Sequence, residues 1–549
     1  MAAPLGGNPA SPGTAVGVVA RLTPAPSLPE HWPEPAGAET EISAATDALA
    51  AVVAELERLA TGMTGEAKDI MDTQIMMAGD PALLDGIRES VGNGRPAAWA
   101  VRDAFGKFLT ALASAGGYLA ERVTDLADIR DRAIAHILGL APPGIPESDE
   151  PFVLVGVDLA PADTVTLDPA KVVAIVTEKG GPTSHTAIVA RALGIPAVVG
   201  CAAAGSLTDG QRIVVDGTLG LITVDPDDEL VTRIGQETAA LAARLGKHSG
   251  PGSTSDGHPV KLLLNVGGAA GIADAGAADS EGVGLFRTEF LFLDRTEAPS
   301  LDEQRDAYAK VFSAFAGRSV VIRTLDAGAD KPVPFANDDD EPNPALGVRG
   351  YRLGRRNPGL VKTQLEAISL AARGSGAEVL VMAPMIATPA EAAEFAETAR
   401  AYGIGKVGVM IEVPAAAIRA DEILAEVDFV SIGTNDLSQY TFAADRMLGE
   451  LSELLDPWQP ALLDLVAATA EAAQRVGKPV GICGEAASDP LLAPVFAGLG
   501  ITSLSMSPPA VPAVRAALKE KTFVECKKLA EQVLGAHDAV TAREIARGL

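Results

Sequence analysis

The stretch "GGPTSHTAIVAR" at 180–191 places His185 between a glycine-rich turn and a pattern typical of a helix. In the first turn of a helix, free N–H groups and the positive end of the helix dipole disfavour imidazolium, so the ring is expected to stay a neutral nucleophile. The same features stabilise a phosphate once it is attached. Gly180 and Gly181 let the backbone approach an anion, and three hydroxyl groups can donate hydrogen bonds: Thr183, Ser184 and Thr186. The turn therefore suggests a histidine that carries a phosphoryl group, although a lone histidine is more often packed core.

A second set of polar residues follows apolar runs in the carboxyl-terminal half. Its members are Arg287, Arg323 with Asp326, Met385, Glu412, Asn435 with Asp436, and Cys483 with Glu485, while Arg349 and Arg446 lie in nearby loops. Arginines that converge from separate segments would bind a multiply charged anion, because guanidinium groups match phosphate and carboxylate oxygens. Each residue also has a plainer interpretation. Arg287 could pair with Glu289, Asp436 could cap its helix, and Lys331 in "DAGADK" could be solvated.

Two carboxylates, Glu412 and Asp436, come from adjacent predicted strands. Mg²⁺ typically takes one or two protein carboxylates and completes its octahedron with substrate oxygens and water. Cys483, at the end of an apolar run, is either a buried small hydrophobe or a proton donor at the site. The predicted ligand is a small phosphorylated carboxylic acid bound through Mg²⁺.

The elements that must position these residues are eight short apolar runs that mostly alternate with helical stretches after residue 260. The runs are "VKLLLNV", "GVGLFR", "SVVIRTLD", "EVLVMAPMI", "KVGVMIEV", "DFVSIGTND", "KPVGICGE" and "ITSLSM". Alternation in this number is typical of a (β/α)8 barrel, whose active site lies at the carboxyl ends of its strands. A doubly wound open sheet is the competing prediction.

The amino-terminal part reads as an α/β unit that is interrupted by helices. Residues 12–22 predict a strand, 37–140 predict long helices, and β-rich alternation resumes after 151. The early strand is expected to join the later ones, which makes the helical block an insertion. Residues 226–247 predict a charged amphipathic helix, and "HSGPGSTSDGHP" at 248–259 predicts a flexible linker.

Composition narrows the class of protein. The chain has 549 residues, 48% of them hydrophobic, and a net charge of −28. This charge argues against nucleic acid or an anionic membrane as the main partner. Three widely spaced cysteines suggest a reducing compartment, and no charge-free run is long enough for a spanning helix. A cytoplasmic, multidomain protein is expected.

Longer motifs resemble a known superfamily. "GGPTSHTAIVARALGIPAVVG" is similar to the phosphohistidine signature shared by enzyme I of the phosphoenolpyruvate:sugar phosphotransferase system, pyruvate phosphate dikinase and phosphoenolpyruvate synthase. "GVGLFRTEFLF", "IRTLDAGADKP", "NPALGVRGYR", "VGVMIEVPAA", "FVSIGTNDLSQYTFAADR" and "GICGEAASDP" resemble its phosphoenolpyruvate-binding barrel. The domain order and "NPASPGTAVGVV" resemble the enzyme I family over essentially the whole chain.

The resemblance implies roles for individual residues. His185 would accept the phosphoryl group, with Thr164 as a partner of its ring, and Cys483 would protonate the enolate carbon to give pyruvate. Glu412 and Asp436 would bind Mg²⁺. The residues implied to hold phosphoenolpyruvate are Arg287, Arg323, Asn435, Asp436 and Arg446, with Lys331 and Arg349 nearby.

The resemblance also implies a domain organisation. Segments 1–23 and 144–225 would form a swivelling phosphohistidine domain, and the helical bundle inserted at 24–143 would dock the small histidine-containing phosphocarrier protein. Residues 226–258 would form a linker helix and hinge. Residues 259–549 would form the (β/α)8 barrel, through which similar proteins are homodimers.

Other functions remain open at this point. In a dikinase or synthase, ATP would charge His185, but the chain shows no nucleotide-binding glycine loop. A regulatory phosphorelay protein would use the same histidine to control partners. A barrel lyase acting on similar acids would leave the His185 domain without a role.

Overall fold

The computed structural model describes residues 4–60, 71, 74–115, 117–146, 148, 150–159, 163, 167–181, 184–246, 248–268, 271–293, 295–328, 333, 335–336, 341–446 and 448–548. Its contacts divide the chain into two compact units, Met1–Thr238 and Ala239–Leu549. The division falls inside a single helix, α8 (Asp228–Leu245).

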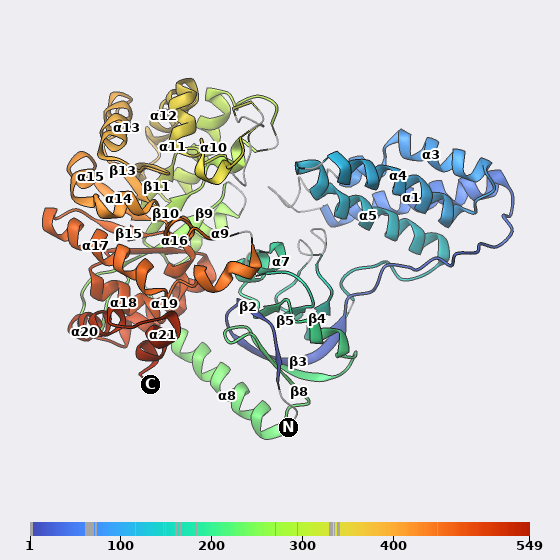
Figure 1. Cartoon of the computed structure of the whole chain (residues 1–549), viewed down its shortest axis with the longest axis horizontal. Helices are drawn as coiled ribbons and strands as arrows, with labels where there is room; N and C mark the ends of the chain where they lie inside the picture. Colours follow the sequence, from blue (N-terminus) through green and yellow to red (C-terminus); the bar gives the residue numbers. More distant parts are fainter. Residues whose placement is uncertain are drawn as a thin grey trace. The chain divides into compact units, whose positions relative to one another are not determined.

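The first unit contains an eight-stranded mixed sheet in the order β1-β8-β7-β3-β4-β5-β6-β2 (Figure 1). Strand β3 (Thr14–Arg21) is parallel to β4 (Phe152–Gly156) and antiparallel to β7 (Arg212–Asp216). The prediction that the early strand joins the later sheet is therefore confirmed. The remaining strands are β1 (Leu5–Gly6), β2 (Asn8–Ser11), β5 (Val172–Thr177), β6 (Ala197–Val199) and β8 (Leu221–Val224).

The sheet is buried on both faces because its strands are apolar at consecutive positions. Ile175 packs into one hydrophobic cluster and its neighbour Val176 into another, as the two-residue period of a strand requires. Helix α7 (His185–Leu193) contributes Ala187 and Ala190 to the cluster of Ile175. The sheet therefore supports the helix that begins at His185.

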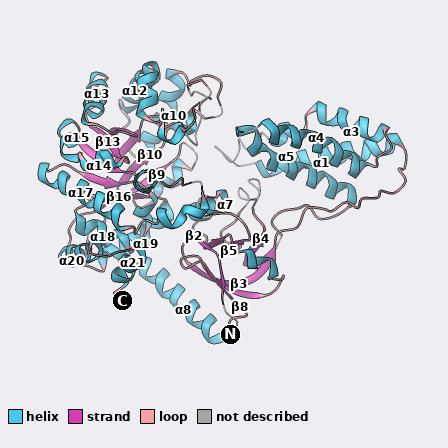
Figure 2. Cartoon of the chain, viewed as in Figure 1, coloured by secondary structure: helices cyan, strands magenta, loops and turns pink. Residues whose placement is uncertain are grey.

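A helical bundle is inserted between β3 and β4 (Figure 2). Its helices are α1 (Ala38–Ala60), α3 (Pro81–Gly92), α4 (Ala97–Ala115) and α5 (Gly117–Leu138). The bundle has its own hydrophobic core, which includes Leu56, Trp99, Phe105 and Ile129. The predicted insertion of a helical bundle is confirmed.

The second unit is a closed parallel barrel. Strand β9 pairs with β10 on one side and with β16 on the other, so the barrel closes and the open-sheet alternative is wrong. All eight predicted runs form its strands. Their bounds are β9 (Lys261–Val266), β10 (Gly282–Phe286), β11 (Ser319–Arg323), β12 (Glu378–Ala383), β13 (Val407–Ile411), β14 (Phe429–Ile432), β15 (Val480–Ile482) and β16 (Ser503–Met506).

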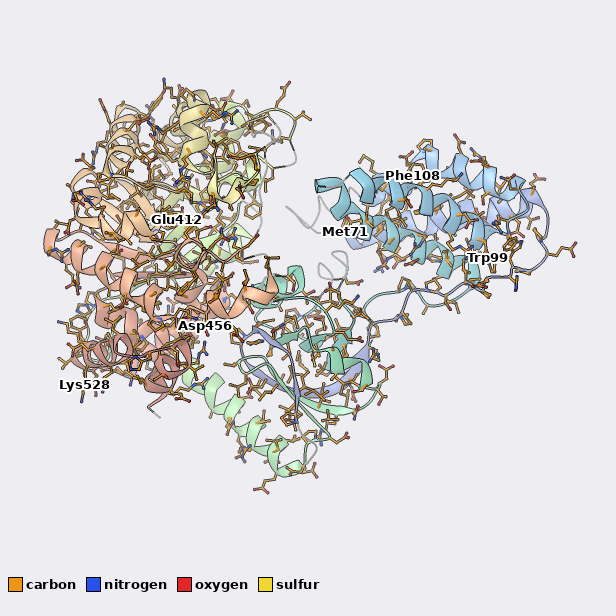
Figure 3. The ribbon with its side chains drawn as sticks, viewed as in Figure 1. Met71, Trp99, Phe108, Glu412, Asp456 and Lys528 are labelled. Carbon is orange, nitrogen blue, oxygen red and sulfur yellow. The ribbon has the colours of Figure 1, made fainter. Side chains whose placement is uncertain are left out.

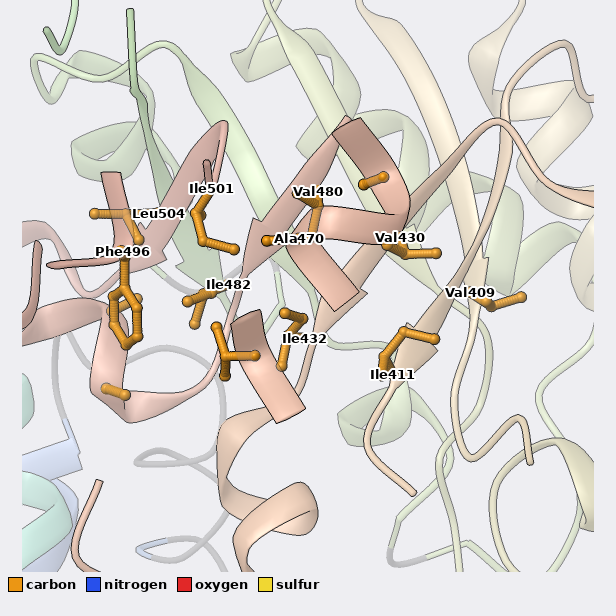
Figure 4. Close-up of a cluster of buried hydrophobic side chains, with 14 of the residues drawn as sticks. Val409, Ile411, Val430, Ile432, Ala470, Val480, Ile482, Phe496, Ile501 and Leu504 are labelled. Atoms are coloured by element: carbon orange, nitrogen blue, oxygen red, sulfur yellow. The ribbon is translucent and has the colours of Figure 1, made fainter. Parts of the chain in front are cut away.

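Helices surround the barrel and share one large core with its strands. In Figure 4, Ile411 and Ile432 on neighbouring strands lie in the same apolar layer as Ile482 and Phe496. The helices are α9 (Ile272–Ala277), α10 (Leu301–Ala314), α11 (Tyr351–Arg356), α12 (Pro358–Ala372), α13 (Pro389–Ala401), α14 (Pro414–Ile418), α15 (Ala420–Glu426), α16 (Thr434–Phe442), α17 (Pro460–Val476), α18 (Leu492–Leu499), α19 (Val511–Lys519), α20 (Phe523–Leu534) and α21 (Ala539–Arg547).

The segment 248–259, predicted as a flexible linker, is tied to the barrel over much of its length. The backbone N–H of Gly252 donates to Glu281 at 2.9 Å, and His258 stacks on Phe523 with ring centroids 3.6 Å apart. The glycine and serine content suggested mobility, but acceptors and rings from remote parts of the barrel hold this segment in place.

Within the part of the chain that the structure describes, no helix is both long enough and apolar enough to span a membrane.

Candidate functional site

The first candidate position is the start of α7. The Ser184 hydroxyl accepts a hydrogen bond from the backbone N–H of Ala187 at 3.4 Å, as an N-cap serine does. Gly194 ends the helix in the left-handed conformation, with φ of 69°. His185 is thus the first helical residue, where unbonded N–H groups and the helix dipole favour an attached anion.

The turn before α7 agrees with the prediction in part. Gly180 has φ of +97°, a conformation that favours glycine. The Thr186 hydroxyl, by contrast, is buried and donates to Asp158 at 3.1 Å, so Thr186 supports the loop instead of facing an anion. Thr183, Thr164 and the side chain of His185 lie outside the described residues, and their roles stay predictions.

The second candidate position is the mouth of the barrel, at the carboxyl ends of its strands. Arg287 directly follows β10, Arg323 ends β11 and Glu412 directly follows β13. Asp436 lies in the first turn of α16, which follows β14, and Cys483 directly follows β15. Residues that are far apart in the sequence thus gather where barrels usually hold their active sites.

Arg349 joins two of the carboxylates at this mouth. One guanidinium nitrogen, Nη1, lies 3.0 Å from Asp436 Oδ1, and the other, Nη2, lies 3.3 Å from Asp326 Oδ2. Arg446 approaches the second oxygen of Asp436 at 3.7 Å. Both oxygens of Asp436 therefore face arginines.

Arg323 extends this network on its other side. Its guanidinium lies 2.9 Å from Asp326 Oδ2 and 2.8 Å from Glu289 Oε1, and all three side chains are buried. Asp326 thus contacts both Arg323 and Arg349. The structure brings together the predicted residues Arg323, Arg349, Asp436 and Arg446 in one chain of ion pairs.

Glu412, labelled over the barrel in Figure 3, directly follows β13, and its side chain is fully buried. One oxygen, Oε1, accepts a hydrogen bond from the backbone N–H of Met385 at 2.6 Å. The other, Oε2, has no hydrogen-bond partner among the described residues. Burial, reinforced by the charges of Asp436 and Asp326, raises the pKa of Glu412 to about 8. A buried carboxylate with an open oxygen is unusual in a folded protein and favours a cation site.

These residues fit the predicted magnesium site. Mg²⁺ needs only one or two protein carboxylates when a phosphorylated ligand supplies other oxygens. The open oxygen of Glu412 and the carboxylate of Asp436 can fill that role. Among the described residues, no group of three or more histidine, cysteine, aspartate or glutamate side chains could hold a metal on its own.

Cys483 was predicted to be either a buried small hydrophobe or a proton donor, and its surroundings are compatible with both. Its side chain packs in the barrel interior with Leu285, Met410 and other apolar residues. Burial raises the pKa of its thiol to about 11, although a hydrogen bond with Ser431 lowers it. The group therefore remains a protonated thiol near neutral pH and is able to donate a proton.

Two other predicted site residues, Asn435 and Arg287, also lie at the barrel mouth. The side-chain oxygen Oδ1 of Asn435 accepts a hydrogen bond from the backbone N–H of Glu485 at 3.1 Å, which ties the ends of two neighbouring strands together. Arg287 lies close enough to Cys483 for its charge to lower the pKa of the thiol. Lys331 is outside the described residues.

The sequence prediction missed Tyr440. The hydroxyl group of Tyr440 accepts a hydrogen bond from Arg349 Nη1 at 3.3 Å and donates to the backbone carbonyl of Ala345. Tyr440 lies four residues after Asp436 on α16, and residues at this spacing share a helix face. That spacing was the available signal.

A cavity of about 420 Å³ lies at the opposite end of the barrel, where the strands begin. It is lined by Gly250, Pro251, Lys261, Asp279, Ser280, Glu281, Gly317, Arg318, Ser319 and Glu378. Two of its three carboxylates are already engaged: Asp279 pairs with Arg515 at 3.2 Å, and Glu281 accepts hydrogen bonds from backbone N–H groups. Conserved chemistry in barrels of this type gathers at the carboxyl ends of the strands, so we place the site at the mouth.

Family models match three parts of the chain. The PEP-utilising enzyme N-terminal model matches residues 6–122, the mobile-domain model matches 148–220, and the PEP-binding-domain model matches 243–523. The last of these spans the whole barrel mouth.

Full-length relatives agree with these matches. A phosphoenolpyruvate-protein phosphotransferase of Streptomyces coelicolor is 50% identical, with 100% of this chain and 99% of that protein covered. Proteins of the same name from Haloferax volcanii and Bacillus subtilis are 41% and 36% identical, over 91% and 96% of this chain and the same shares of theirs. The chain belongs to the phosphoenolpyruvate-protein phosphotransferase family of PEP-utilising enzymes, which is the enzyme I family that its motifs resemble.

Proposed function

We propose that this protein transfers the phosphoryl group of phosphoenolpyruvate to His185 and then to a histidine-containing phosphocarrier protein, releasing pyruvate. This reaction is the first step of the phosphoenolpyruvate:sugar phosphotransferase system. The observation that carries the proposal is the barrel mouth. There Arg323, Arg349 and Arg446, from three separate segments, pair with buried carboxylates beside Glu412, which keeps one oxygen open.

The arginines bind and orient the substrate. Arg323, Arg349 and Arg446 present guanidinium groups that match the phosphate and carboxylate oxygens of phosphoenolpyruvate. Because Arg323 and Arg349 are buried, their charges act in a medium that screens them poorly, and they can neutralise the phosphoryl group as it moves.

Two residues take part directly in the reaction: His185 accepts the phosphoryl group and Cys483 supplies a proton. A neutral ring nitrogen of His185 forms a bond to phosphorus while the bond from phosphorus to the enol oxygen breaks. The enolate takes a proton on its methylene carbon from the thiol of Cys483, and pyruvate results. The thiolate regains its proton from water, because its pKa of about 11 lies far above neutrality.

Glu412 and Asp436 would hold Mg²⁺ at this mouth. When bound, the ion neutralises charge on the phosphoryl oxygens of the substrate.

The partners also belong to the proposal. The helical bundle would dock the phosphocarrier protein. The bundle has its own hydrophobic core, and the side chain of Met76 on it is 70% exposed to solvent. Dimerisation through the barrel and a cytoplasmic location remain predictions; sedimentation of the full chain and cell fractionation test them. Within the hinge proposed at 226–258, we place the moving element at α8, because the segment from Gly250 onward is hydrogen-bonded to the barrel.

The direct test is labelling. We expect the full chain to take ³²P from phosphoenolpyruvate in the presence of Mg²⁺, to form an acid-labile adduct, and to pass the label to the carrier protein. His185→Ala should take no label while it still binds phosphoenolpyruvate. Label in that variant would contradict the assignment of the acceptor, and labelling of the native chain by ATP would favour a dikinase or synthase.

A further inference from the structure

The carboxylate of Asp436 is engaged on both sides in the ligand-free arrangement. Its Oδ1 lies 3.0 Å from Arg349 and its Oδ2 lies 3.7 Å from Arg446. A metal ion cannot take this carboxylate at full strength while two guanidinium charges face the same oxygens, because the charges repel it. Of the two carboxylates proposed to hold the metal, Glu412 alone keeps an open oxygen among the residues that the structure describes.

Arg349 is positioned to leave Asp436 without losing its place in the protein. Its Nη2 remains bonded to Asp326, and its Nη1 also donates to the hydroxyl of Tyr440. Its Nε has no hydrogen-bond partner among the described residues, so the guanidinium has unused capacity for an anion. A phosphate near this group would compete directly with Asp436 for Arg349.

From these contacts we propose that Arg349 gates the metal site: it occupies Asp436 until the phosphorylated substrate binds the guanidinium and releases the carboxylate to the metal ion. Metal and substrate then bind interdependently, and each raises the affinity for the other by the same factor. The proposal rests on the proposed function only for the identity of the substrate.

Arg349 is better placed for this role than its neighbours. Arg446 lies farther from Asp436, and its side chain is 22% exposed, against 3% for Arg349. Arg323 is as deeply buried as Arg349, and its charge also acts on Glu412, but its ion pairs go to Glu289 and Asp326. Arg323 therefore supplies a matched control: a nearby buried positive charge whose ion pairs do not include Asp436.

The test measures binding of Mn²⁺, a paramagnetic substitute for Mg²⁺, to the full chain by electron paramagnetic resonance. All variants carry His185→Ala so that phosphoenolpyruvate binds without reacting. In this background we expect phosphoenolpyruvate to tighten Mn²⁺ binding by about 5- to 150-fold, the usual range of coupling between sites. Arg349→Gln should tighten Mn²⁺ binding in the absence of phosphoenolpyruvate by a factor in the same range, roughly 5-fold or more.

The controls separate the gate from a simple charge effect. Arg323→Gln should tighten substrate-free Mn²⁺ binding much less than Arg349→Gln, and an equal effect would overturn the proposal. Arg349→Lys keeps the charge but cannot bridge Asp326 and Asp436, so a smaller gain is expected. If Arg349→Gln fails to fold, Arg349→Lys decides, and unchanged Mn²⁺ affinity in that variant overturns the gate.

Failure of the gate and failure of the proposed function give different results. If the gate is wrong, the native chain is still labelled by phosphoenolpyruvate at His185, while Mn²⁺ affinity does not respond to changes at Arg349. If the proposed function is wrong, labelling fails, and phosphoenolpyruvate leaves Mn²⁺ affinity unchanged even though Arg349→Gln raises it.

Discussion

Two buried arginines, Arg132 in the helical bundle and Arg349 at the barrel mouth, each bridge carboxylates from separate elements. Arg132 lies 2.8 Å from Asp128 on its own helix, 3.1 Å from Glu55 on α1 and 3.5 Å from Asp163, which lies between β4 and β5 in the sequence. Arg349 bridges Asp326 and Asp436. The side-chain chemistry is the same in both places.

The two clusters differ in what they leave unsatisfied. In the bundle, burial raises the pKa of Asp128, but its carboxylate is bonded to Arg132, which lowers that pKa again. At the barrel mouth, Glu412 is fully buried, contacts no arginine in any ion pair of the described residues and keeps one oxygen open. A closed ion-pair cluster holds elements together, whereas a cluster with an open buried oxygen is suited to take a ligand. The first is a structural device and the second is a binding site.

Glu412→Gln should have the largest effect on labelling of His185. The substitution preserves shape but removes the charge that a metal needs, so the rate of His185 labelling should fall by about 1,000-fold, which is a loss of several kcal/mol of charge stabilisation. Stability should not fall, since a buried carboxylate with a raised pKa is itself unfavourable in the fold. Rapid-quench labelling and thermal unfolding measure the two effects.

Asp128→Asn is the matched control in the bundle. It removes a carboxylate of similar burial, yet labelling of His185 by phosphoenolpyruvate should stay near the native rate. Equal losses of labelling in the two variants would mean that Glu412 is only a structural carboxylate.

Arg132→Met should show the opposite pattern. Removing the shared cation, which is itself buried, leaves the partly buried Glu55 and Asp128 without their partner, and the loss of such a pair costs about 3 kcal/mol. Hydrogen exchange in α1 and α5 should quicken by roughly 100-fold, because exchange follows the local opening free energy. The barrel strands should exchange as before. If hydrogen exchange in the barrel strands became equally faster, the two units would unfold together, and the prediction would be wrong.

The sequence indicated the parts of the barrel site but not their connections. The positions of Arg323, Glu412 and Cys483 at strand ends followed from apolar runs, because the parallel strands of a barrel all end at one mouth. The pairing of Arg349 with Asp436 did not follow, because it depends on loop paths and side-chain rotamers that no local pattern encodes.

The same limit explains the segment at 248–259. Glycine and serine favour mobility in isolation, but the carboxylate of Glu281 and the ring of Phe523, remote in sequence, fix it. Local composition does not predict such contacts, because the contacting residues are far apart in the sequence.

Cys483→Ser should separate substrate binding from turnover at the barrel mouth. The hydroxyl is a poorer acid than the thiol, so turnover should fall by about 100-fold, the lower range for loss of a general acid. The affinity for phosphoenolpyruvate should change little, because the arginines are untouched. Stopped-flow detection of pyruvate measures turnover, and calorimetry in the His185→Ala background measures binding. Unchanged turnover would reduce Cys483 to packing among Leu285 and Met410.

The smallest expected effect is the response of metal affinity to pH. This response should depend on Glu412 and not on Asp128. The folded protein holds a proton on Glu412 up to about pH 8, whereas the ordinary value is 4.5, so stability from this group is full below pH 4.5 and is lost as pH rises to 8. A metal must displace that proton. Its affinity should therefore rise about fivefold from pH 7 to 8 and level off above 9, with nearly one proton released per metal ion at pH 7. Calorimetry in buffers of different ionisation enthalpy counts the proton. Glu412→Gln should abolish the release and Asp128→Asn should leave it intact. A native protein that releases no proton would mean that Glu412 is already charged, and that burial, Asp436 and Asp326 do not raise its pKa.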